Sequence, residues 1–176
     1  MSIRVAVIGA KGRMGSHAVD AINGADGLEL VAALGSSDPL ETLLDANIDV
    51  AVELTVPKST EDTVTFLVEH DIDTVVGTTG WDNDRLARLE AKLKDHPQTA
   101  VLIAPNFSIG AVLAMRFAEL AAPYFDSAEV VEIHHTRKLD APSGTANHTA
   151  HRFKQSRNFN SSKTTIVHNL KIKDTR

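Results

Sequence analysis

The feature that most constrains the fold is a β-branched run that ends directly in a glycine-rich turn. Residues 3–8 read Ile-Arg-Val-Ala-Val-Ile, and residues 9–15 read Gly-Ala-Lys-Gly-Arg-Met-Gly. A helix from about Met14 to Asn23 is predicted to follow. Strand, glycine turn and helix in this order are typical of a dinucleotide-binding fold, where glycines let the backbone approach a pyrophosphate at the helix N-terminus. Three glycines can also form only a tight turn, but their position after a buried-type strand favours the nucleotide interpretation.

The chain continues as an alternation of apolar strands and helices. Strands are predicted near residues 28–34, 50–54, 74–76, 100–103 and 128–134, and helices near residues 60–70, 82–95 and 109–122. Such alternation predicts an α/β fold with a parallel sheet and right-handed crossovers. Ligands of such sheets bind at the carboxyl ends of the strands. We therefore expect the loops at 77–80 and 104–107 to line the same crevice as residues 9–15, although ordinary turn chemistry explains either loop taken singly.

A second dense motif lies in the last third of the chain. Residues 132–146 read Glu-Ile-His-His-Thr-Arg-Lys-Leu-Asp-Ala-Pro-Ser-Gly-Thr-Ala. Histidine can donate a proton near neutral pH, and lysine adds a fixed positive charge. The Pro-Ser-Gly-Thr run predicts a turn into a helix whose free N–H groups suit a carboxylate or phosphate. The motif is thus either a proton donor beside an anion cradle or a strand with one structural histidine, since His134 and His135 would face opposite sides of a continuous strand.

Composition excludes several classes of site and partner. The 176 residues include no cysteine and no His-Glu-x-x-His helix, so no metal site is expected. No apolar run approaches the ~20 residues that span a bilayer, and no secretory signal is visible, so we expect a cytoplasmic protein without membrane contact. Residues 154–176 carry six Lys or Arg against one acid, leaving twelve against twenty-two in the body. That acidic body argues against a nucleic-acid partner.

The residues alone leave the choice between NADH and NADPH open. The acid that binds the ribose in this kind of fold is expected ~20 residues past the glycines, at Gly35. The polar residues nearest to that position are Ser36, Ser37 and Asp38. No Lys or Arg occurs between Met14 and Lys58. A 2′-phosphate would therefore have to find its positive charge inside the glycine loop, at Lys11 or Arg13.

Four segments taken together resemble the dihydrodipicolinate reductases, also called 4-hydroxy-tetrahydrodipicolinate reductases, of bacterial lysine and diaminopimelate biosynthesis. In chain order they are the glycine loop, Gly-Thr-Thr-Gly at 77–80, Ala-Pro-Asn-Phe-Ser-Ile-Gly at 104–110, and the motif at 132–146. The last has the highly specific family form E-x-H-H-x-x-K-x-D-A-P-S-G-T-A. The resemblance covers roughly residues 3–153. It implies hydride transfer from NADH or NADPH to a cyclic imine dicarboxylate, giving tetrahydrodipicolinate.

The resemblance also implies a role for each matching residue. His134 would donate the proton, with Lys138 as its catalytic partner. The substrate dicarboxylate would be bound by His135, Ser143, Gly144 and Thr145. Cofactor contacts are implied for Gly9, Ala10, Lys11, Gly12, Arg13, Met14, Gly77, Thr78, Thr79, Ala104, Pro105, Asn106 and Phe107.

The expected organisation is a Rossmann-type domain over residues 1–126 and an incomplete α+β substrate domain over residues 127–176. The segment 154–176 is expected to diverge from the family, and one strand near 164–172 would lack partners. The family's homotetramer is therefore not expected for this chain. An active reductase is the main hypothesis. The alternatives are a catalytically impaired remnant that only binds dinucleotide, or another Rossmann oxidoreductase acting on a different small acid.

Overall fold

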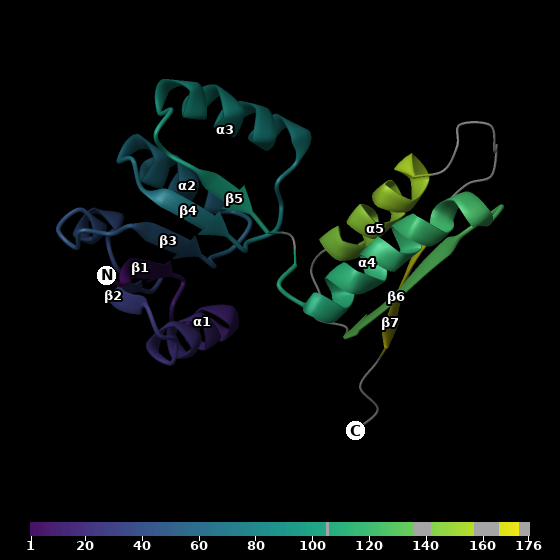
Figure 1. The fold of residues 1–176 in the computed structure, drawn as a ribbon, viewed down its shortest axis with the longest axis horizontal. Coiled ribbons are helices and arrows are strands. Elements are labelled where there is room, and N and C mark those ends of the chain that lie inside the picture. Colours follow the sequence, from purple (N-terminus) through teal and green to yellow (C-terminus); the bar gives the residue numbers. More distant parts are fainter. Residues whose placement is uncertain (105, 136–141, 157–165, 173–176) are drawn as a thin grey trace. The chain divides into compact units, whose positions relative to one another are not determined.

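The chain folds into two compact units, Met1–Ala104 and Pro105–Arg176. The computed structural model describes residues 1–104, 106–135, 142–156 and 166–172, with residues 135 and 166–172 described through their backbone only. Each unit is built around its own sheet, as Figure 1 shows. The predicted α/β class, with a parallel sheet and helices, is confirmed.

Five parallel strands form the sheet of the first unit. In the spatial order β2-β1-β3-β4-β5 they are Leu28–Leu34, Ile3–Ile8, Val50–Glu53, Asp73–Val76 and Val101–Ile103. The chain thus runs outward from β1 in both directions, because β2 pairs with one edge of β1 and β3 with the other. In open parallel sheets this switch point opens a crevice at the carboxyl ends of the strands, where ligands bind.

Helices cover both faces of this sheet. Successive side chains of β1 point to opposite faces, and the apolar side chains on both faces need to be buried. They are α1 (Arg13–Asn23), α2 (Thr60–Glu69) and α3 (Asn83–Asp95), and a short 3₁₀ turn, η1 (Leu40–Leu43), precedes β3. Val5 and Val7 pack with Ile22 of α1 in one buried cluster. Ala6 and Ile8 pack in a second cluster with residues of η1 and α2. Each large aliphatic side chain buried in this way stabilises the fold by roughly 1.5–3 kcal/mol.

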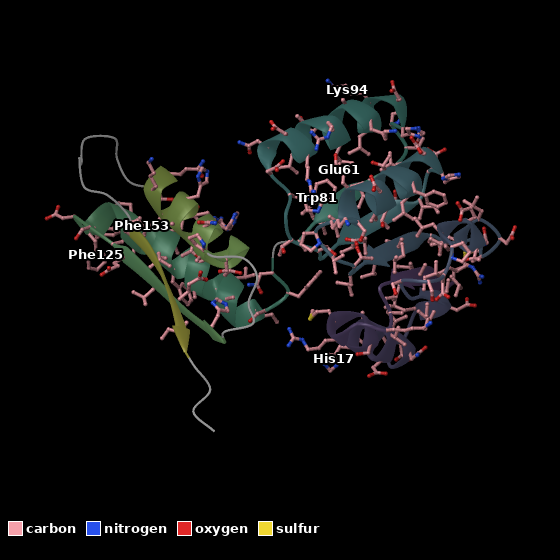
Figure 2. The ribbon with its side chains drawn as sticks, turned by 180° about the vertical axis from the view of Figure 1, so that it is seen from behind. His17, Glu61, Trp81, Lys94, Phe125 and Phe153 are labelled. Atoms are coloured by element: carbon pink, nitrogen blue, oxygen red, sulfur yellow. The ribbon has the colours of Figure 1, made fainter. Side chains whose placement is uncertain are left out.

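Polar contacts join α2 to α3 on one side of the unit, where Figure 2 labels Glu61 and Trp81. Glu61 Oε1 accepts a hydrogen bond from Arg88 Nε at 2.6 Å, and its Oε2 accepts one from Arg88 Nη2 at 3.1 Å. Arg85 Nε lies 3.2 Å from the same Oε2. Asp82 caps α3, and its Oδ1 accepts a hydrogen bond from the Arg85 N–H at 2.9 Å. These contacts fix the loop after β4 between its two helices.

The second unit contains α4 (Ile109–Ala121), η2 (Ala122–Tyr124), β6 (Glu129–His135), α5 (Gly144–Gln155) and β7 (Ile166–Ile172). Its strands form a two-stranded parallel ribbon, the helix α5 packs against this ribbon, and the helix α4 packs against α5 (Figure 1). Phe153 of α5 is buried (Figure 2). On β6, Glu132 and His134 lie on one face and are half-buried, while Val131 and Ile133 on the other face are 53% and 56% exposed. The alternation of β6 therefore directs its two motif side chains to the same side.

Two features of the second unit differ from the expectation. Helix α4 packs against α5 and groups with the second unit, so the division by contacts falls after Ala104 and not at residue 126. The strand expected near 164–172 is present as β7, and it has a partner, because Ile166 to Ile172 pair in register with Glu129 to His135 of β6. The boundary between the units depends on packing between α4 and α5, and the partner of β7 depends on its pairing with β6. Both are contacts between segments that are distant in the sequence.

Two kinds of feature are not found within the described ranges. None of the helices there is long and apolar enough to cross a membrane. The same residues include no group of three His, Cys, Asp or Glu side chains placed to hold a metal ion.

Candidate functional site

The glycine loop after β1 is closely packed against its neighbours. Gly9 has a φ of +86°, and a Cβ there would lie 2.3 Å from the Leu54 carbonyl oxygen. A Cβ on Gly15 would lie 2.0 Å from the Gly9 carbonyl oxygen. At Gly12, the N-cap of α1, a Cβ would meet only the Gly9 oxygen, at 3.2 Å. Gly9 and Gly15 are therefore required by the fold itself, whereas Gly12 faces open space that a ligand can enter.

The start of α1 offers unpaired donors at this loop. The first N–H groups of a helix have no carbonyl partner within it. Here these include the N–H groups of Arg13 and Met14, and both residues are exposed, as is Lys11. The positive end of the helix dipole adds to the charge of the two cations. This arrangement suits a pyrophosphate.

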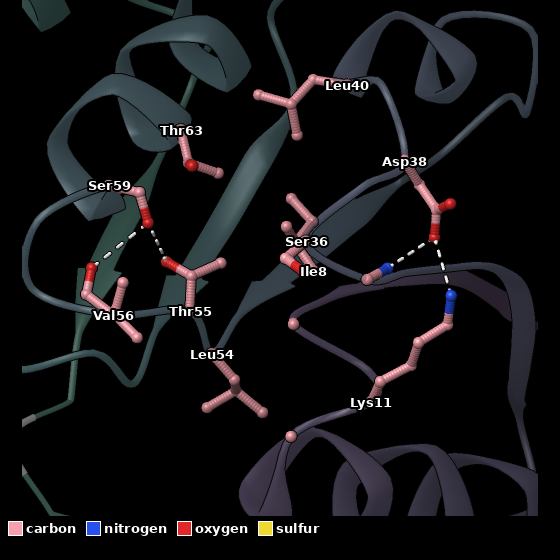
Figure 3. Close-up of a pocket in the computed structure, with 13 residues that line it drawn as sticks. Ile8, Lys11, Ser36, Asp38, Leu40, Leu54, Thr55, Val56, Ser59 and Thr63 are labelled. Atoms are coloured by element: carbon pink, nitrogen blue, oxygen red, sulfur yellow. Dashed lines mark hydrogen bonds and ion pairs between the residues drawn. The ribbon is translucent and has the colours of Figure 1, made fainter.

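A pocket of about 560 Å³ opens beside the glycine loop (Figure 3). Its walls come from the ends of β1, β2 and β3 and from the start of α2: Ile8, Gly9, Lys11, Gly12, Gly35, Ser36, Asp38, Leu40, Leu54, Thr55, Val56, Ser59 and Thr63. The loop at 77–80, expected in the same crevice, does not contribute to this lining. The pocket lies at the switch point of the sheet order, where β1 has β2 on one side and β3 on the other. The loop after β3, and not the loop after β4, therefore forms the wall opposite β2.

Asp38 brings a carboxylate to the end of β2 although Gly35 occupies the expected position. Its Oδ2 accepts the Gly35 N–H at 2.7 Å and lies 3.5 Å from Lys11 Nζ, as the dashed lines in Figure 3 mark. The Gly35 N–H and then the Lys11 charge hold the pKa of Asp38 below its ordinary value of 3.8. An ionised acid therefore lines the pocket where a ribose hydroxyl is bound in related folds.

A buried carboxylate that the sequence reasoning did not single out supports the β3 side of the pocket. Glu53, at the end of β3, is fully buried. It accepts hydrogen bonds from the Thr55 N–H at 3.0 Å, from the Thr55 hydroxyl, and from the Thr60 hydroxyl at 2.7 Å. Ser59 Oγ in turn donates to Thr55 Oγ1 at 3.2 Å (Figure 3). The sequence signal for this network is Glu53 itself, a charged residue that directly follows the apolar residues 50–52 in the same strand.

The loop after β4 lies next to the β3 loop. Arg85 Nη1 donates to the carbonyl oxygens of Pro57, at 2.8 Å, and of Gly80, at 3.0 Å. Of the predicted cofactor residues here, Gly77 is half-buried, Thr79 is exposed, and Thr78 is buried. Thr78 Oγ1 is buried without a hydrogen-bond partner among the described residues. An unpaired buried hydroxyl is costly, so this atom has hydrogen-bonding capacity to offer a ligand.

In the second unit, Ser143 begins α5 as predicted for the Pro-Ser-Gly-Thr turn. Its Oγ accepts the Ala146 N–H at 3.1 Å, which is the usual N-cap contact. Its own N–H donates to Glu132 Oε1 at 2.7 Å. The N–H groups of Gly144 and Thr145 follow at the open end of the helix, where an anion is favoured.

His134 lies beside the same glutamate. Its Nδ1 is 3.6 Å from Glu132 Oε2, and the two side chains are 31% and 9% exposed. Both of these atoms are buried, and neither has a hydrogen-bond partner within the described part of the chain. Glu132 thus stands between the imidazole and the first turn of α5.

Asn106, expected as a cofactor contact, reaches the substrate-side residue Thr145. Its Nδ2 donates to Thr145 Oγ1 at 3.0 Å, while its Oδ1 accepts the Ser108 N–H at 2.8 Å. Phe107 is 49% exposed, and Ala104 ends the first unit with its N–H donating to the Val76 oxygen at 2.8 Å. Pro105, Lys138 and the side chain of His135 lie outside the described residues.

Comparisons with known proteins agree with the family resemblance seen in the sequence. The family models described as dihydrodipicolinate reductase, N-terminus and C-terminus, match residues 3–107 and 110–176. The second match includes the segment 154–176, which we expected to diverge. The 4-hydroxy-tetrahydrodipicolinate reductase of Streptomyces avermitilis is 63% identical over 148 residues, covering 84% of this chain and 59% of the relative. That of Corynebacterium aurimucosum is 54% identical over 150 residues, covering 85% and 60%.

Solved structures show the same relationship. A dipicolinate-bound dihydrodipicolinate reductase from Paenisporosarcina sp. TG-14 is 31% identical, with a TM-score of 0.76, over 97% of this chain and 80% of that one. The myo-inositol 2-dehydrogenase of Lactobacillus plantarum, 16% identical with a TM-score of 0.59 over 76% of this chain and 46% of its own, shares the fold alone.

The parallel sheet, the glycine loop and the pocket at the switch point define a dinucleotide-binding protein of the Rossmann type. With both family models matching in order, the chain belongs to the dihydrodipicolinate reductase family. Reductases of this family use NAD(P)H. The chain spans about three fifths of the length of the curated relatives it matches.

Proposed function

We propose that this chain carries the nucleotide-binding and proton-donating parts of a reductase of lysine and diaminopimelate biosynthesis, which converts a dihydrodipicolinate-type cyclic imine dicarboxylate to tetrahydrodipicolinate. The names of the relatives supply the reaction class. The observation that carries the proposal is the position of Glu132, which contacts both the Ser143 N–H and the His134 ring. An imidazole that can give a proton thereby lies beside a helix start that can hold a carboxylate.

The first unit fits a reduced nicotinamide dinucleotide. Gly12 leaves open space at the loop, the N–H groups of Arg13 and Met14 suit the pyrophosphate, and the pocket holds Asp38 at the ribose position. Thr78 offers its unpaired hydroxyl on the β4 loop. When bound, the nicotinamide would supply a hydride to the C=C carbon that is conjugated with the imine, and this addition leaves an enamine.

The chain's own residues then bind the substrate and move a proton. The N–H groups of Gly144 and Thr145 and the Thr145 hydroxyl hold a carboxylate, since donors to a charged group give the stronger hydrogen bonds. His134 gives its proton to the enamine carbon left by reduction. By the family resemblance, Lys138 assists this step and His135 binds the dicarboxylate. A positioned general acid of this kind is typically worth about 10²–10⁴ in rate.

Cofactor preference follows from Asp38 and Lys11. A carboxylate at the ribose favours the 2′-hydroxyl of NADH, and it repels the 2′-phosphate of NADPH. Lys11, 3.5 Å from Asp38, offsets that repulsion. We therefore propose that the chain accepts both dinucleotides.

Calorimetry and steady-state kinetics on matched variants test the proposal. His134→Ala should lower kcat by about 10²–10⁴ with little change in KM, because a proton donor acts in the transition state. His151→Ala, on the exposed side of α5, is the control and should behave as the parent. An unchanged kcat with a raised KM for His134→Ala would remove the proton-donor role. Absence of dinucleotide binding in the parent chain would overturn the whole proposal.

A further inference from the structure

Glu132 is an acid of the motif to which the family resemblance assigns no role. Glu132 lies on β6 two residues before His134, so the alternation of the strand places both side chains on the same face. Helix α5 packs against this strand (Figure 1). Glu132 is only 9% exposed. A carboxylate buried to that degree requires specific partners.

Its two oxygens have different partners. Oε1 accepts the Ser143 N–H at 2.7 Å, just before the first turn of α5. Oε2 is buried and has no hydrogen-bond partner among the described residues, and its ion-pair contact there is with His134 Nδ1 at 3.6 Å. That nitrogen is buried as well and has no other partner there. The two orphaned atoms therefore satisfy each other with a small movement of either side chain.

The chemistry of this pair determines which imidazole nitrogen holds a proton. An ionised carboxylate only accepts hydrogen bonds, so an imidazole nitrogen that bonds to it must carry the hydrogen. The partner of one ring nitrogen thus sets the state of the other. With Nδ1 held as a donor to Glu132, the proton that His134 exchanges with its surroundings must be the one on Nε2.

We propose that Glu132 is a positioning residue that fixes the neutral His134 ring as the Nδ1–H tautomer and makes Nε2 the proton-donating atom. The same carboxylate holds the Ser143 N–H, so it ties the imidazole to the helix start that would bind a substrate carboxylate. The orientation of the proton donor and the position of the anion site are set by one side chain. The catalytic consequence rests on the function proposed above, whereas the tautomer is a property of the folded chain alone.

The test is long-range ¹H–¹⁵N correlation NMR on the full chain with ¹⁵N-labelled histidine, at a pH where the ring is neutral. The shifts of the two ring nitrogens report the tautomer directly, with no dinucleotide or substrate present. His134 in the parent chain should show Nδ1–H. Finding Nε2–H there overturns the proposal by itself, so the test does not depend on the folding of any variant.

The variant Glu132→Gln tests whether Glu132 sets the tautomer of His134. Its amide oxygen can still accept the Ser143 N–H, which turns the NH₂ group toward Nδ1 and forces that nitrogen to accept. His134 should then switch to Nε2–H, while exposed His151 keeps its signals. A structural role alone would leave the tautomer unchanged, and that outcome in a folded variant contradicts the proposal. In an active preparation, kcat of Glu132→Gln should fall at least tenfold with KM little changed. Nδ1–H in an inactive chain would support this proposal and count only against the reductase function.

Discussion

Asn106 and Thr145 are joined by a hydrogen bond of 3.0 Å from Nδ2 to Oγ1. The direction of this bond is fixed, because the other amide atom of Asn106, Oδ1, already accepts the Ser108 N–H at 2.8 Å. Thr145 Oγ1 is thus an acceptor toward Asn106, and its single proton is left to donate elsewhere. A substrate carboxylate at the start of α5 is the partner we propose.

Variants of Asn106 test this direction. Asn106→Ala removes the bond and should weaken dipicolinate binding roughly fivefold, the equivalent of about 1 kcal/mol for a neutral hydrogen bond. Asn106→Asp should weaken it more, because the new carboxylate accepts the Thr145 proton and also repels the ligand. Calorimetry gives both affinities. Equal affinities for the Ala and Asp variants would show that the Thr145 proton is not directed to the ligand.

Thr145→Val tests the donor itself. It removes the hydroxyl with little change in volume, and a hydrogen bond to a charged group is worth about 1.5–3 kcal/mol. Dipicolinate binding should fall roughly 10- to 100-fold, while dinucleotide binding should be unchanged. Thr149→Val, one turn further along α5, is the control, because Thr149 Oγ1 donates to the Thr145 carbonyl oxygen at 2.7 Å and so has an intrahelical partner.

The glycine loop is tested by Gly12→Val. A side chain there occupies the open space at the start of α1, while its own clash is limited to the Gly9 oxygen at 3.2 Å. Dinucleotide affinity should fall at least tenfold, whereas thermal stability should change little. Gly24→Ala, at the other end of α1, is the control, because its Cβ meets the Asp20 oxygen at an ordinary 3.4 Å. A Gly12→Val chain with the parent's affinity would disprove the role of the loop.

Substitutions of the two charged residues of the pocket, Asp38 and Lys11, should shift the preference between NADH and NADPH in opposite directions. Asp38→Asn removes the repulsion of a 2′-phosphate and should raise the affinity for NADPH relative to NADH. Lys11→Met removes the offsetting charge and should lower that ratio, with an effect that weakens as salt is added. Fluorescence titration with both dinucleotides measures the ratio. A ratio that moves the same way in both variants would contradict the assignment of Asp38 and Lys11.

The contact between α2 and α3 makes stability depend on pH through Glu61. The hydrogen bond from Arg88 holds the pKa of Glu61 below its ordinary value of 4.5. The folded chain therefore favours the ionised form, so this contribution is present above pH 4.5 and is lost as the pH falls through the lowered pKa. Glu61→Gln should lower the Tm at pH 7, and the difference from the parent should vanish in acid. Glu90→Gln, on the exposed side of α3, should show no such trend.

Much of the fold could be read from the sequence, because its signals are local. The strand predicted at 28–34 coincides with β2, and the glycine loop and the helix start after Pro142 lie where the pattern put them. Strand propensity, glycine conformation and helix capping act over a few residues. Such features need no knowledge of the sheet order.

The parts that sequence reasoning missed depend on contacts between distant segments. The order β2-β1-β3 places Thr55 and Ser59 in the pocket in place of the loop at 77–80. Asp38 was one of three polar candidates near the expected position, and only the fold of the β2 loop, which brings its carboxylate to the Gly35 N–H, distinguishes it from Ser36 and Ser37. The packing of α4 on α5 likewise moved the division between units to Ala104. The roles assigned to the site residues remain predictions, and Lys138, Pro105 and the side chain of His135 also lie outside the described residues.

We propose that the chain moves a hydride to a cyclic imine dicarboxylate and that His134 supplies the proton. The most direct measurement uses NADPH carrying deuterium at the transferred position and mass analysis of the product. We expect singly deuterated tetrahydrodipicolinate from the parent chain, formed about 10²–10⁴-fold more slowly by His134→Ala and at the parent rate by His151→Ala. Dinucleotide binding without any labelled product would contradict the reductase function and favour a chain that only binds dinucleotide.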